Sequence, residues 1–164
     1  MKLHRSLLLF LFGAVLVTSC SKKERAGANA HAGHDHSAHA HEHIAPHGGT
    51  PVVLGKEVYH LELVLNRVSG KLSAYVFDGE MDKYIRLATS SFEVVATVNG
   101  AKQTLTFNAV GDSATGEKIG DTALFEATAA WLKTTPRFDA VLTKIEIRGT
   151  TFSDVAFNFP KGND

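Results

Sequence analysis

The chain is poor in sulfur, because its 164 residues include one cysteine, Cys20, and two methionines. A single cysteine excludes an intramolecular disulfide, so packing alone must hold the fold even in an oxidising compartment. Long apolar runs are also missing. The run from Leu7 to Val17 has 11 residues, whereas a helix needs about 20 to cross a bilayer. We therefore expect no permanent transmembrane helix.

Clusters of one charge sign are scarce as well. The 17 basic side chains balance 17 acidic ones, and the one short basic cluster is Lys22 to Arg25. Binding to nucleic acid requires a basic patch that neutralises phosphates, so we expect no nucleic-acid partner. No nucleophile is placed beside a readable base, and no G-x-S-x-G motif occurs, so we do not expect an enzyme.

The N-terminus is organised like an export signal. Lys2 and Arg5 precede the apolar run, and the run is followed by Val-Thr-Ser-Cys, residues 17–20. This end resembles the lipobox of a bacterial lipoprotein precursor. The resemblance implies a signal peptide over 1–19, acylation of Cys20, and a mature chain of formal charge −2, with 15 basic and 17 acidic side chains, on the periplasmic face of a membrane. In many bacterial lipoproteins an aspartate after the acylated cysteine retains the protein in the inner membrane. Ser21 stands at that position here, which favours the outer membrane. A soluble secreted protein is the alternative.

Residues 20–46 carry little apolar surface, and we expect them to form a lipidated, disordered tether. Seven of the nine histidines lie between residues 31 and 47, six in this segment and one just after it, with one to three residues between neighbours: His31, His34, His36, His39, His41, His43 and His47. Free imidazole has a pKa of about 6.5, so most of its lone pairs are available at neutral pH. Neutral imidazole suits Zn²⁺, Cu²⁺, Ni²⁺ and Co²⁺. The tract is therefore expected to bind divalent transition metal; a solvated spacer is the alternative.

From residue 51 onwards the apolar pattern has a period of two, which is typical of strands. Asn99-Gly100 and Ser69-Gly70 are turn signals between neighbouring strands, and Trp131 is expected to cap the core from a short helix or turn. We predict an all-β fold, a single antiparallel β-sandwich of immunoglobulin-like type over residues 47–160, followed by a tail at 161–164. The predicted strands are 58–65, 72–78, 84–88, 92–98, 103–109, 124–127, 138–148 and 154–159.

A second set of candidate ligands lies in the domain. His60 and Glu62 share the face of their strand opposite the leucines, about 7 Å apart. If the glycines after His47 turn the chain back across this strand, His47, His60 and Glu62 would form an ordered metal site. Asp78 or Glu80 would complete it. The alternative is an ordinary exposed or hydrogen-bonded histidine on a strand.

The loop at 111–122 carries no specific motif. Glu117 occupies the position where a phosphate-binding loop needs lysine. The acidic residues Asp112, Glu117 and Asp121 do not have the spacing of an EF-hand. A solvated connection is expected.

The stretch 46–79, "PHGGTPVVLG…YHLELVL…GKLSAYVFDG", is similar to small bacterial periplasmic lipoproteins in which a His-rich leader precedes a compact β-domain. This resemblance implies an accessory role in metal homeostasis, with a metal-efflux system as partner. Met81 is the only methionine of the mature chain, which argues against a Cu(I) carrier. The alternative function is a structural or interaction lipoprotein that docks on an envelope complex and uses the tether as a spacer.

Overall fold

The computed structural model describes residues 44–163, which form an all-β domain with one short 3-10 helix. No helix in this part of the chain is long and apolar enough to span a membrane. The elements are β1 (Thr50–Leu54), β2 (Tyr59–Asn66), β3 (Lys71–Asp78), β4 (Ser91–Val98), β5 (Ala101–Ala109), β6 (Leu124–Thr128), η1 (Ala130–Lys133), β7 (Phe138–Ile147) and β8 (Thr150–Phe159).

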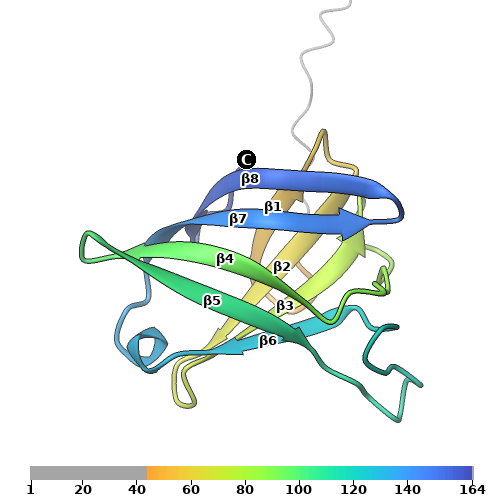
Figure 1. Ribbon diagram of the computed structural model, residues 1–164, viewed down its shortest axis with the longest axis horizontal. Coiled ribbons are helices and arrows are strands. Elements are labelled where there is room, and N and C mark those ends of the chain that lie inside the picture. The colour runs from red at the N-terminus through yellow and green to blue at the C-terminus, as the bar shows by residue number, and fades with distance from the viewer. Residues whose placement is uncertain (1–43, 164) are drawn as a thin grey trace, which may run out of the picture. The chain divides into compact units, whose positions relative to one another are not determined.

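All eight strands belong to one antiparallel sheet with the order β1-β2-β3-β6-β5-β4-β7-β8. Hairpins join β1 to β2, β2 to β3, β4 to β5 and β7 to β8. In Figure 1, β4, β5, β7 and β8 lie in front of β1, β2 and β3, whose direction crosses theirs. The sheet thus curls around its own apolar face and is nearly closed.

The two ends of the sheet order, β1 and β8, are linked by the C-terminal residues. The side-chain amide of Asn163 accepts a hydrogen bond from the N–H of Val53 at 2.8 Å and donates one to the carbonyl of Val53 at 3.2 Å. It therefore occupies the place of a neighbouring strand beside β1. Satisfying the edge in this way limits the backbone groups that β1 offers to other chains.

The core consists of the inward-facing residues of the strands. Burial alternates along β4, whereas β2 and β3 are buried on both faces over part of their length. Phe92 of β4 and Phe107 of β5 are register partners, and their rings stack with centroids 5.0 Å apart. In β7 the buried positions shift by one, from Leu142 to Ile145, where the pairing with β4 is irregular. A bulge of this kind moves the side-chain phase by one residue. The strand therefore keeps its apolar side chains inward on both sides of the irregularity.

The structure confirms the predicted all-β, antiparallel architecture. The immunoglobulin-like sandwich is not confirmed, because the strands follow one another in a single nearly closed sheet. The Asn99-Gly100 turn between β4 and β5 is confirmed, and both residues have positive φ. Trp131 lies in η1 and packs edge-on against Phe138 at a centroid distance of 5.2 Å, at one end of the core.

One predicted strand is wrong, and one observed strand was not predicted. Residues 84–88 form isolated bridges to β3 and to Thr122 rather than a strand. The first strand, β1, was not predicted, because Thr50-Pro51 has the composition of a turn. Proline is tolerated there because β1 is the end strand of the sheet order, where a missing donor costs little.

Candidate functional site

The N-terminal turn carries His47 onto the outer face of the β2–β3 hairpin. The N–H of Gly48 donates to the carbonyl of Ala45 at 2.9 Å, and Gly48 has a left-handed φ of 66°. Gly49 lies so close to β2 that an added Cβ would stand 2.6 Å from the carbonyl oxygen of Leu63. Only glycine allows such an approach of two backbones. The Gly-Gly pair therefore lets the chain cross β2 beside the imidazole.

Glu62 of β2 anchors this turn through a carboxylate with no exposed surface. Its Oε1 accepts hydrogen bonds from the backbone N–H of His47 at 2.7 Å and of Gly49 at 2.9 Å. Its Oε2 lies 2.7 Å from Nδ1 of the His47 ring. A buried carboxylate is costly unless it is hydrogen-bonded. These three contacts offset that cost and fix the turn to the strand.

The imidazole of His47 is held in one orientation. A neutral imidazole that donates from Nδ1 to the carboxylate of Glu62 would carry its lone pair on Nε2. The hydroxyl of Tyr84 lies 3.1 Å from Nε2 and would donate to it in that tautomer. The ring of Tyr75 stacks on the imidazole, with centroids 3.9 Å apart and an angle of 13° between the planes. The His47 side chain is 30% exposed, so a solute can approach the ring.

Both tyrosines keep their phenolic protons at neutral pH. Burial, then the charge of Glu126, then that of Glu62, raises the pKa of Tyr75 above its ordinary value of about 10. Burial, then Tyr75, then Glu62, raises the pKa of Tyr84. The site has the arrangement of a catalytic triad, with Tyr84 in the place of the nucleophile, His47 in that of the base and Glu62 in that of the orienting carboxylate. A raised pKa is the opposite of what an activated nucleophile needs, so Tyr84 acts here as a hydrogen-bond donor.

His60 and Glu62 share one face of β2, but that face is not the half-exposed one that the sequence predicts. Both residues are 0% exposed. Their register partners on β3 are Phe77 and Tyr75, whose side chains lie on the same face. The exposure prediction is wrong because these aromatic side chains and the N-terminal turn cover the face. The result is a buried polar and aromatic layer outside the main core.

The remaining predicted ligands do not gather around His47. Nδ1 of His60 lies 3.4 Å from the carbonyl oxygen of Asp78. The carboxylate of Asp78 accepts the N–H groups of Asp82 at 3.0 Å and Lys83 at 3.2 Å, so it holds the turn after β3. Glu80 is exposed. Within residues 44–163, no group of three or more His, Cys, Asp or Glu side chains is placed to hold a metal ion.

The structure thus joins His47 to Glu62 and leaves the ligand roles of His47, His60 and Glu62 as predictions. Cys20 and the other six tract histidines lie outside the described residues, so lipidation and metal binding there also stay predictions. The latter are His31, His34, His36, His39, His41 and His43.

Tyr75 and Tyr84 belong to the site and were not predicted. Tyr75 could have been predicted from the register of the β2–β3 hairpin, because Tyr75 pairs with Glu62 and paired residues have their side chains on the same face. No local pattern marks Tyr84, which reaches the site from the irregular segment after β3. Its backbone forms an isolated β-bridge with Phe77, and its hydroxyl reaches His47.

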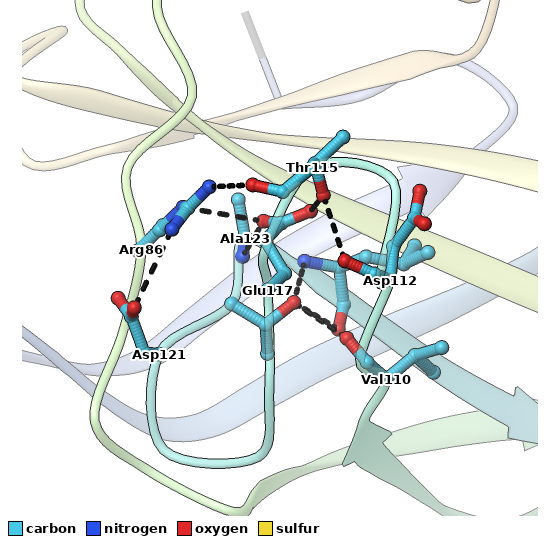
Figure 2. A network of polar contacts seen from close by, with 9 residues as sticks. Arg86, Val110, Asp112, Thr115, Glu117, Asp121 and Ala123 are labelled. Atoms are coloured by element: carbon cyan, nitrogen blue, oxygen red, sulfur yellow. Dashed lines mark hydrogen bonds and ion pairs between the residues drawn. The ribbon is translucent and has the colours of Figure 1, made fainter.

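The loop between β5 and β6 forms a second polar cluster (Figure 2). Glu117 accepts hydrogen bonds from the N–H of Ala123 and the hydroxyl of Thr115, each at 2.8 Å. The guanidinium of Arg86 donates to the carbonyl of Thr115 at 2.8 Å and lies 3.4 Å from the carboxylate of Asp121. The predicted connection is therefore ordered by its own contacts rather than merely solvated. The acidic side chains of Glu117 and Asp121 form contacts that hold the loop in place.

No protein-family model matches the chain, and neither the curated proteins nor the solved structures compared with it include a match.

Proposed function

We propose that the protein is a membrane-anchored periplasmic lipoprotein that binds divalent transition metal through its His-rich tether, as an accessory to metal homeostasis or efflux. The lipid on Cys20 would hold the chain at the membrane, with the outer membrane favoured. The tract would collect Zn²⁺, Cu²⁺, Ni²⁺ or Co²⁺ and pass it to a partner.

The observation that carries this proposal is the contact between His47 and Glu62. Metal-binding histidines commonly donate their second ring N–H to a carboxylate, which fixes the tautomer and makes the ligating nitrogen more basic. His47 has this arrangement, with Nδ1 held 2.7 Å from a buried carboxylate oxygen. It is also the last histidine of the tract, at the point where the tract meets the domain. A plain spacer has no need for an oriented imidazole at its end.

The tract offers many imidazole nitrogens as metal ligands, but its sequence encodes no fixed arrangement of them. Ordering a flexible chain around an ion consumes part of the coordination free energy, so each ion is expected to bind with moderate affinity. Moderate affinity suits a protein that buffers a metal or hands it on, because release must be possible.

The test is a calorimetric titration of the mature chain with Zn²⁺, Ni²⁺ or Cu²⁺. A six-fold variant replaces the tract histidines by asparagine, which keeps length and polarity and deletes the donors; the changed residues are His31, His34, His36, His39, His41 and His43. It should lose most metal equivalents. The control, Asp35→Asn with Glu42→Gln, alters charge but keeps every imidazole and should retain most of them. Undiminished binding in the six-fold variant would reduce the tether to a spacer and favour docking on an envelope complex.

A further inference from the structure

The geometry points to an ordered site for one Cu²⁺ ion, in which Nε2 of His47 and the phenolic oxygen of Tyr84 are adjacent ligands. Water would fill the other positions. This inference rests on the proposed function and adds to it a ligand, Tyr84, and a preferred metal.

The spacing of the two donor atoms is that of neighbouring ligands. Nε2 of His47 and the hydroxyl oxygen of Tyr84 are 3.1 Å apart. With metal–ligand bonds of about 2.0 Å, two ligands at a right angle lie about 2.8 Å apart and two tetrahedral ligands about 3.3 Å apart. The observed distance falls between these values. An ion can therefore replace the hydrogen bond with small side-chain movements.

The imidazole of His47 is preorganised as a metal ligand. Glu62 fixes Nδ1, Tyr75 stacks on the ring, and the backbone N–H of His47 is also bonded to Glu62. A ligand that is already oriented loses little entropy when it binds an ion. This ligand should therefore bind ahead of the flexible tract histidines.

Both donors are accessible to solvent. The His47 side chain is 30% exposed and Tyr84 is 53% exposed. Ile44, at the start of the described chain, is 87% exposed. Three residues separate His43 from His47 in the sequence, so the two lie four positions apart, a span of at most about 14 Å when extended.

The ligand types select the metal. A mixed nitrogen and oxygen set in a square-planar or tetragonal arrangement is typical of Cu²⁺ and Ni²⁺, and Cu²⁺ binds more tightly than Ni²⁺ at a given site. When the oxygen of Tyr84 binds, its proton passes to water, and the oxygen–Nε2 hydrogen bond is exchanged for two metal–ligand bonds. No oxidant or reductant is involved.

The test is a titration of the full mature chain with Cu²⁺, followed by visible absorption. A phenolate ligand gives a charge-transfer band, which should saturate at one equivalent. Tyr84→Phe and His47→Asn should each abolish the band and weaken that equivalent at least about tenfold, since loss of even an outer partner of a ligand costs about 10-fold to 100-fold. Tyr59→Phe is the matched control, because Tyr59 packs against Phe152 and not against His47. It should leave the band unchanged.

A band that survives in Tyr84→Phe, or a mature chain that binds copper without any such band, would overturn this inference and leave the proposed function standing. The proposed function fails separately, if the six-fold variant keeps all its metal equivalents. Tyr84 is half exposed, so Tyr84→Phe is expected to fold, and its thermal melt should match that of the unchanged protein.

Discussion

Nδ1 of His47 and a carboxylate oxygen of Glu62 lie 2.7 Å apart, fifteen positions apart in sequence, and the carboxylate is fully buried. This contact ties the end of the His-rich tract to the folded sheet. It holds one imidazole of the tract in a fixed direction. The folded domain is thus built to hold the last histidine of the tract in place.

The first prediction concerns the stability that this contact provides. Glu62→Gln removes the charge and leaves one oxygen to accept where two accepted before. One buried donor then loses its partner, so the free energy of unfolding should fall by about 1–3 kcal/mol in a denaturant titration. Glu146→Gln, on an exposed position of β7, should change it by less than about 0.5 kcal/mol. Equal effects in the two variants would mean that the buried carboxylate is not an anchor.

The second prediction concerns the edge of the sheet. Asn163→Ala removes the two hydrogen bonds to Val53. The N–H of Val53 should then exchange with deuterated solvent faster, and the domain should lose about 1 kcal/mol of stability. Lys161→Ala, at an exposed neighbouring position, should leave both quantities unchanged. Unaltered exchange at Val53 in Asn163→Ala would show that β1 does not depend on this side chain.

The third prediction ranks two members of the β5–β6 loop cluster. Glu117→Ala leaves the N–H of Ala123 without its acceptor and should cost about 1–3 kcal/mol. Arg86→Ala breaks ion pairs of a side chain that is 39% exposed, where such pairs contribute about 0–1 kcal/mol. Thermal melts of the two variants give the ranking directly. A larger loss of stability in Arg86→Ala than in Glu117→Ala would show that Arg86 contributes more to the stability of this cluster.

The sequence predicts most strands because one face of each strand is apolar. Apolar and polar residues therefore alternate along the strand, and this pattern can be recognised in the sequence. It fails at residues 84–88, where apolar side chains reach the core without a continuous strand partner. It also fails at β1, where Pro51 is compatible with a strand only because β1 lies at the end of the sheet order. Whether strands form one sheet or two depends on pairings between distant segments, such as β3 with β6, that no local pattern encodes.

The candidate site was predictable in part for the same reason. The spacing of His60 and Glu62 along the strand, and the turn at Gly48-Gly49, indicate that His47 can meet Glu62. Burial of that face depends on the aromatic residues of β3 and on Tyr84. Tyr84 arrives from an irregular segment whose path follows from tertiary contacts.

The fourth prediction concerns the anchor. Cys20→Ala deletes the residue that the lipobox resemblance marks for acylation. Unprocessed precursor or soluble protein should replace the protein that partitions into the detergent phase. Cys20 is the only cysteine, so a serine at the same position is a second, near-isosteric check. Unchanged partitioning of either variant would contradict the lipoprotein assignment.

The central claim is that the tether, rather than the sheet, binds most of the metal. Isothermal titration of the mature chain and of a chain without residues 21–46 tests it most directly, with Zn²⁺ at two pH values on either side of about 6.5, the ordinary imidazole pKa. The account predicts several equivalents for the mature chain, weaker at the lower pH because protons displace the metal. It predicts at most one equivalent for the truncated chain. Equal stoichiometry in the two chains would contradict it.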